Sequence, residues 1–162
     1  MGFYHTSQVC LNGHVITDRY DSSPEFRRKF CPKCGAATIT ACPSCNTPIQ
    51  GDYEVQGVGV LSGRLTPAPT FCHNCGKRFP WTEARARAAQ ELIELQDGLS
   101  DDDRSVLKKS VEDIMVDSPQ TAVAATRLKV FLSRAGKALA PVMEKILVEI
   151  ATTAAKKTMF GD

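Results

Sequence analysis

The fold of this chain is decided by a short stretch that reads Phe30-Cys31-Pro32-Lys33-Cys34-Gly35 and continues to Cys42-Pro43-Ser44-Cys45. Each half holds two cysteines separated by two residues, and a third pair with this spacing follows at Cys72 and Cys75. Two intervening residues form a tight turn, the zinc knuckle, that points both sulfur atoms at one metal ion. The stretch therefore predicts metal binding.

The seventh cysteine, Cys10, has His14 four residues after it, across the turn-forming pair Asn12-Gly13. The sequence thus offers four ligand pairs, enough to fill two tetrahedral structural zinc sites. An odd number of cysteines suits disulfides poorly, whereas one histidine completes a set of zinc ligands. The predicted ligands are Cys10, His14, Cys31, Cys34, Cys42, Cys45, Cys72 and Cys75.

The pairing of the ligands follows from a repeat. Phe-Cys-x-x-Cys-Gly occurs at residues 30–35 and 71–76, as the closing knuckle of two successive zinc ribbons would. This favours one site made of Cys10, His14, Cys31 and Cys34, and a second made of the remaining four cysteines. An interleaved cross-brace, or a compact site formed by the two central pairs, stays open as an alternative. Gly35, Gly76 and Asn46 follow the knuckles, where a positive φ is needed.

Residues 1–80 are predicted to form this double zinc-ribbon module from short β-hairpins. Strands are expected at residues 15–17, 37–40 and 53–60, the last bent at its glycines. Phe30, Phe71 and Phe79 are expected in a small core around the knuckles.

Residues 81–162 are predicted to be helical, because cysteine and histidine stop and alanine and leucine become frequent. Thr82, Ser100, Ser118-Pro119 and Pro141 are start signals for four amphipathic helices, a helical bundle or pair of hairpins. The chain is therefore expected to be α+β. The apolar face predicted for the first helix is Trp81, Ala84, Ala88, Leu92, Leu95 and Leu99.

The composition places the chain among soluble cytoplasmic proteins. Its hydrophobic fraction is 43% and its charged fraction 23%, and we expect no membrane helix, no secretory signal and no membrane partner. Residues 1–80 hold eight Lys and Arg against five Asp and Glu. Two zinc ions bound by seven thiolates would cancel that excess of +3. Strong non-specific DNA binding is therefore not expected.

The chain resembles a bacterial zinc-ribbon family of unknown function that carries a C-terminal helical tail. The resemblance rests on residues 8–14, 30–35, 42–45 and 72–76, and on Pro80-Trp81-Thr82. It covers nearly the whole chain and is specific for metal binding. It implies the scaffold and no activity.

Catalytic patterns are missing from the sequence. Four ligands for each zinc leave no open position for substrate. No His-Glu-x-x-His, phosphate-binding loop or nucleophile elbow appears, and Val15 and Ile16 follow His14 where a deaminase would need its glutamate. We assign no catalytic residues, and a non-enzymatic role is favoured.

Two kinds of partner fit the sequence. The first is a protein, recognised by the ribbons while the helices mediate docking or homo-oligomerisation. The second is nucleic acid, because basic residues flank the knuckles and aromatics near them can stack on bases. The residues predicted for that contact are Arg27, Arg28, Lys29, Lys33, Lys77 and Arg78. His5 has no evident partner in the sequence.

Overall fold

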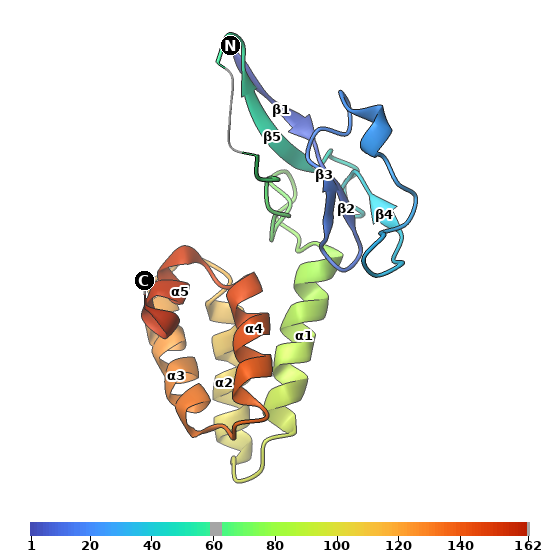
Figure 1. Ribbon diagram of the computed structural model, residues 1–162. Coiled ribbons are helices and arrows are strands. Elements are labelled where there is room, and N and C mark those ends of the chain that lie inside the picture. Colours follow the sequence, from blue (N-terminus) through green and yellow to red (C-terminus); the bar gives the residue numbers. More distant parts are fainter. Residues whose placement is uncertain (59–62, 162) are drawn as a thin grey trace. The chain divides into compact units, whose positions relative to one another are not determined.

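The computed structural model describes residues 1–58 and 63–161 and divides the chain into two compact units, Met1–Thr82 and Glu83–Asp162 (Figure 1). The first unit holds short antiparallel strands and the second holds helices. The α+β prediction is confirmed.

Two small sheets make up the first unit. One pairs β1 (Gly2–Thr6) with β5 (Gln50–Val55), and the other has the order β3-β2-β4. Its strands are β2 (Gln8–Cys10), β3 (Val15–Thr17) and β4 (Thr38–Ile39). The strand predicted at 53–60 begins earlier and ends at Val55, and residues 59–60 of that prediction lie outside the described residues. β1 and β2 were not predicted.

The core of the first unit is small. It consists of Val9, Cys42, Ile49, Cys72, Phe79 and Trp81. The Phe79 and Trp81 rings stack with centroids 4.7 Å apart, and Trp81 Nε1 donates a hydrogen bond of 2.8 Å to the Pro69 carbonyl. A core of this size contributes little free energy of folding by itself.

The prediction that three phenylalanines cover the knuckles is right for Phe79 and wrong for Phe30. Phe30 is 64% exposed, and Phe71 is half-buried. Phe30 lies in extended backbone, bridged to Ala37, where successive side chains point to opposite sides. Because Cys31 points into its cluster and is buried, Phe30 points outward.

His5 links the two strands of the first sheet to the loop after β3. Its Nδ1 lies 2.8 Å from Asp21 Oδ2 and its Nε2 lies 2.9 Å from Glu54 Oε2. An imidazole with carboxylates at both nitrogens must carry both protons to donate two hydrogen bonds. Burial lowers the pKa of His5, but the hydrogen bonds to Glu54 and Asp21 outweigh burial and leave the pKa raised.

The second unit has five helices where four were predicted. They are α1 (Pro80–Glu94), α2 (Asp101–Asp113), α3 (Thr121–Arg134), α4 (Ala140–Ile150) and α5 (Thr153–Phe160). α3 packs against α2, α4 and α5. α5 is separate because Ala151 and Thr152 are extended and the Thr152 side chain accepts from the Ala155 amide as a new N-cap.

The helix starts follow the predictions only in part. Ser100 caps α2 through a reciprocal capping box with Asp103, and Pro141 lies in the first turn of α4. Thr82 is not an N-cap, since α1 begins at Pro80 and Thr82 Oγ1 donates instead to the Thr70 carbonyl. α3 begins at Thr121, after a turn that holds Ser118-Pro119.

The apolar face predicted for the first helix is wrong. The buried residues of α1 are Trp81, Thr82, Ala86, Ala89 and Ile93, whereas Leu95 is 74% exposed. α1 ends at Glu94, so Leu95 and Leu99 lie beyond the helix and share no face with it. Among the described residues, no helix is long and apolar enough to cross a membrane.

The observed buried face of α1 predicts unequal effects of two truncations near its end. Ile93 is fully buried, so Ile93→Ala should lower the free energy of unfolding of the helical unit by about 2–5 kcal/mol. Leu95→Ala, the matched control, should change it by less than ~0.5 kcal/mol. Urea denaturation followed by the helical circular dichroism signal measures both. Equal losses for the two variants would contradict the observed face.

The His5 network predicts a pH-dependent stability. The raised pKa of His5 gives a contribution that is full below about pH 6.5 and is lost as the pH rises through the raised value. The pKa values of Asp21 and Glu54 are lowered, so their contributions are present above about pH 4.5 and are lost in stronger acid. The metal-loaded protein should therefore exceed His5→Gln in stability most clearly between about pH 4.5 and 6.5.

The stability difference should shrink in alkali. Urea denaturation of the wild type and of His5→Gln at pH 6 and at pH 9 measures this difference. The higher pH is still about one unit below the pKa of a lysine side chain. The control is Leu95→Ala, which changes an exposed side chain that does not titrate and should show no such pH dependence. A His5→Gln difference that is the same at both pH values would contradict the ion pairs.

Candidate metal centre

The first cluster brings together Cys10, His14, Cys31 and Cys34, whose ligand atoms all lie within 4.8 Å of one another. Cys10 Sγ lies 3.5 Å from His14 Nδ1 and 3.8 Å from Cys34 Sγ. Cys31 Sγ lies 3.6 Å from the same nitrogen. His14 therefore faces the sulfur atoms through Nδ1.

The second cluster brings together Cys42, Cys45, Cys72 and Cys75, within the same limit. Cys42 Sγ lies 3.8 Å from Cys75 Sγ, and Cys45 Sγ lies 3.6 Å from Cys72 Sγ. Every cysteine of the chain is a free thiol in the structure. The eight predicted ligands thus form two groups of four, in the sequential arrangement.

The spacing of these atoms fits a tetrahedral metal ion. With metal–sulfur bonds of about 2.3 Å, the edge of a tetrahedron between two sulfurs is about 3.8 Å, and that between sulfur and an imidazole nitrogen is about 3.5 Å. The observed separations of 3.6–3.8 Å and 3.5–3.6 Å match both edges. A disulfide would need sulfurs about 2 Å apart. Both clusters can bind a metal ion.

Three knuckles have the same backbone. The amides of Gly35, Asn46 and Gly76 donate to the carbonyls of Cys31, Cys42 and Cys72 at 2.8–2.9 Å. All three donors have a positive φ, as predicted, from 60° to 72°. A side chain at Gly35 or Gly76 would meet nothing within 4 Å, so glycine is present there for its backbone and not for space.

Hydrogen-bond donors around the sulfurs favour thiolates. The Ala36 amide and the Asn12 side chain lower the pKa of Cys34 to about 6. The Thr47 side chain and amide lower the pKa of Cys45 to about 5. The Lys77 amide lowers the pKa of Cys75, but desolvation and the neighbouring cysteines outweigh it and raise the pKa to about 11. Four neighbouring thiols do not all ionise readily, and a bound cation would stabilise their thiolate forms.

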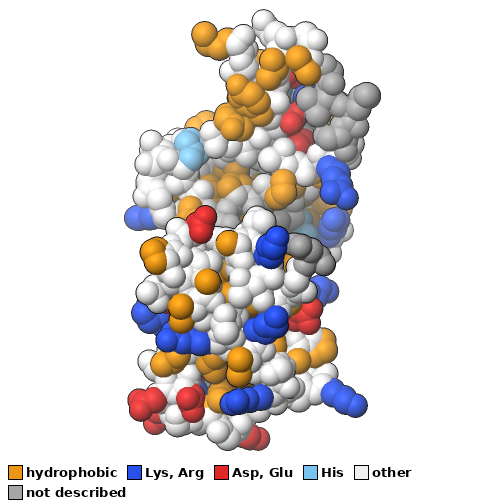
Figure 2. All heavy atoms as spheres, turned by 90° about the vertical axis from the view of Figure 1, so that its left-hand side faces the viewer, with side chains coloured by type: hydrophobic (Ala, Val, Ile, Leu, Met, Phe, Trp, Pro, Cys, Tyr) orange, Lys and Arg blue, Asp and Glu red, His pale blue; other side chains and the backbone are white. Residues whose placement is uncertain are grey.

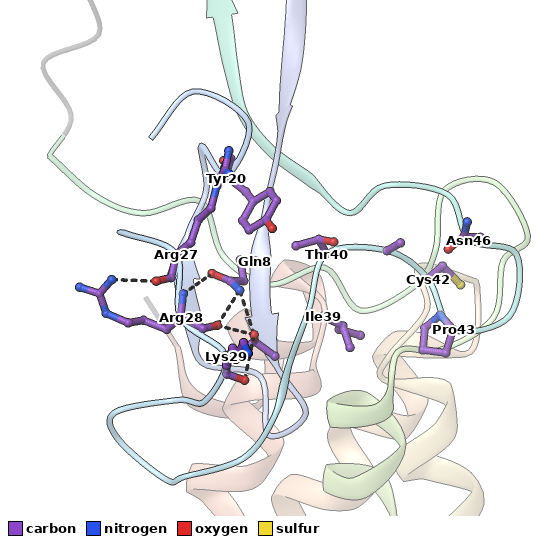
Figure 3. A pocket seen from close by; sticks show the side chains of 12 residues that line it. Gln8, Tyr20, Arg27, Arg28, Lys29, Ile39, Thr40, Cys42, Pro43 and Asn46 are labelled. Atoms are coloured by element: carbon purple, nitrogen blue, oxygen red, sulfur yellow. Dashed lines mark hydrogen bonds between the residues drawn. The ribbon is translucent and has the colours of Figure 1, made fainter. Parts of the chain in front are cut away.

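Three of the predicted basic residues share a pocket. Arg27, Arg28 and Lys29 line a surface pocket of about 620 Å³ in the first unit, together with residues of β4 and the Cys42 knuckle (Figure 3). Lys33, Lys77 and Arg78 do not line it. Lys33 and Lys77 are exposed, and Arg78 is half-buried.

The sequence reasoning missed Gln8, a buried side chain that also lines this pocket. Its Nε2 donates to the Arg28 carbonyl at 2.7 Å, and its Oε1 accepts from the Arg28 amide at 3.1 Å. A polar residue directly before the buried pair Val9-Cys10 was the available signal, because a buried amide needs hydrogen-bond partners.

Comparison with known families gives one match, which covers residues 3–159 and is described as an uncharacterized protein conserved in bacteria (DUF2321). The chain belongs to this family. The match includes the residues of both cysteine clusters and reaches Met159 in α5. No curated protein and no solved structure matches the chain.

The observed grouping of ligands predicts how metal content responds to pairs of substitutions. Cys10→Ser with Cys34→Ser alters one cluster, and the protein should keep one of two metal equivalents. Cys34→Ser with Cys75→Ser alters both clusters, and the protein should lose both equivalents after dialysis against a weak chelator. Elemental analysis of the purified variants measures this. An interleaved cross-brace would give the reverse result for the two pairs.

Proposed function

We propose that this DUF2321 protein is a non-enzymatic adaptor whose first unit is built around two structural zinc ions. In this proposal the first unit recognises a protein partner, and the helical unit mediates docking or self-association.

Zinc is the metal that the donor set favours. Thiolate and imidazole ligands in tetrahedral arrangement are typical of structural zinc sites. Structural zinc contributes about 10–16 kcal/mol in small peptides, comparable to the whole stability of a domain. Clusters of reduced thiols also fit a cytoplasmic location, where disulfides rarely persist.

The observation that carries the non-enzymatic proposal is the complete ligand set of each cluster. Catalytic zinc keeps three protein ligands and an open position, whereas each cluster here offers four ligands at tetrahedral separations. In addition, two cysteines of each cluster are buried, Cys10 and Cys31 in the first and Cys42 and Cys72 in the second, while Cys34 and Cys75 are exposed. Metal held in this way supports a fold and leaves function to the surface.

The helical unit offers an apolar surface for docking. A pocket of about 530 Å³ lies among α2, α3 and the loop between α1 and α2, and its lining includes the exposed Val106 and Val130 and the buried Phe131. Arg127 and Arg134 lie beside them. Figure 2 shows the mixed character of one face of the helices, on which Lys and Arg side chains lie among hydrophobic ones. A surface of this kind is typical of protein contacts.

The adaptor proposal predicts association that depends on this pocket. Val106→Glu with Val130→Glu places charges in the pocket and should abolish self-association in light scattering, or remove the protein partner captured by the tagged full-length chain. The matched control is Val142→Glu with Val148→Glu, two exposed valines of α4 outside the pocket, which should leave association intact. A monomer that captures no protein would contradict the adaptor, as would a pocket variant that associates like the wild type.

Nucleic acid is a second candidate partner, favoured by the distribution of charge in the first unit. Asp52 and Glu54 pair with Arg19, and Asp21 and Glu54 bond to His5. Among the described residues, no carboxylate forms an ion pair with Arg27, Arg28 or Lys29. Three of the acidic groups are therefore paired within the unit, while Arg27, Arg28 and Lys29 are exposed, with the exposed Glu25 two residues before Arg27. Salt-sensitive binding is the property expected of such a surface.

A further inference from the structure

Two exposed aromatic rings lie at the two ends of a short basic stretch of the first unit. Phe26 is 55% exposed and Phe30 is 64% exposed, and the three cations Arg27, Arg28 and Lys29 lie between them in sequence. Exposed apolar rings grouped beside charged side chains are typical of binding surfaces. We call residues 20–30 the platform segment.

The platform segment is held in place by buried polar groups. Gln8 bonds both backbone groups of Arg28, and its Nε2 also donates to Thr38 Oγ1 at 2.9 Å. The Thr38 hydroxyl in turn donates to the Arg28 carbonyl at 2.6 Å (Figure 3). A loop fixed by a buried amide loses little further conformational entropy when it binds a ligand.

Hydrogen bonds to backbone carbonyls orient two of the cations of the platform segment. The Arg27 guanidinium lies 4.3 Å from the centroid of the Tyr20 ring, and its Nε donates to the Tyr20 carbonyl at 2.8 Å. Arg28 Nη1 donates to the carbonyls of Glu25 and Arg27. Both side chains keep further N–H groups for an anion, because a guanidinium has five.

A pocket adjoins these cations. Arg27, Arg28 and Lys29 form one side of the 620 Å³ pocket, and Thr40, Pro43 and Asn46 belong to the opposite side (Figure 3). Its volume is in the range of pockets that hold a small organic group. The pocket cations and the exposed rings thus belong to one short segment of the chain.

We propose that the platform segment binds single-stranded nucleic acid, with unpaired bases stacked on Phe26 and Phe30 and phosphates held by Arg27, Arg28 and Lys29. This inference rests on the second candidate function above. Unpaired bases present their faces to aromatic side chains, whereas the bases of a duplex are stacked on one another. Two exposed rings on either side of three cations therefore favour single strands over duplexes.

The test is fluorescence anisotropy with a labelled single-stranded oligonucleotide, as DNA and as RNA, and with the duplex of the same DNA sequence. The full-length, metal-loaded protein should bind the single strands more tightly than the duplex, with an affinity that falls as salt is raised. Phe26→Ala and Phe30→Ala should each weaken single-strand binding by about 5- to 150-fold, the equivalent of ~1–3 kcal/mol per stacked base. Their weak duplex binding should be unchanged.

Two controls separate stacking from charge and from folding. Phe3→Ala removes a ring on β1 that is 45% exposed and lies outside the platform segment, and it should leave binding unchanged. Arg28→Ala should weaken single-strand and duplex binding alike and reduce the salt slope by about one. Metal content and circular dichroism of each variant should match those of the wild type.

The outcomes distinguish the platform proposal from the more general proposal that the first unit binds nucleic acid. Salt-sensitive binding that is equal for single strand and duplex, with both phenylalanine variants unaffected, would overturn the platform and keep nucleic-acid binding. Absence of salt-sensitive binding to any of the three probes would overturn both.

Discussion

We propose that metal–thiolate coordination is the interaction on which the first unit depends. Its strands are two to six residues long and its apolar core holds six residues, too little to offset the entropy lost on folding. Each cluster joins knuckles distant in sequence, Cys10 to Cys34 and Cys42 to Cys75, at separations that suit one tetrahedral ion. In this proposal, the ions supply the stability that a larger hydrophobic core supplies in other domains.

Cross-linking by metal leaves the remaining side chains available for other roles. Aromatic rings that a larger domain would bury stay exposed at Phe26 and Phe30, and polar groups such as Gln8 and His5 hold loops that no apolar layer covers. In the same proposal, the ions fix the loops, and the loops determine which side chains the surface presents.

The sequence predicted which seven cysteines and which histidine come together, and in which two groups, because knuckle spacing is local: two residues between cysteines determine a turn, and a repeat pairs the turns. It predicted the capping of α2 by Ser100 for the same reason. It failed where the answer depends on distant contacts. The exposure of Phe30 and the partners of His5 are set by tertiary contacts. The face of α1 was misjudged because the helix ends at Glu94, before the two leucines that were counted with it.

Zinc X-ray absorption spectroscopy of the freshly purified full-length protein tests the central claim most directly. Seven sulfur ligands and one imidazole shared by two ions should appear as a sulfur-dominated first shell at about 2.3 Å, with a minor nitrogen component. A shell dominated by oxygen would contradict the account, and so would protein that contains no zinc and has its cysteines joined as disulfides.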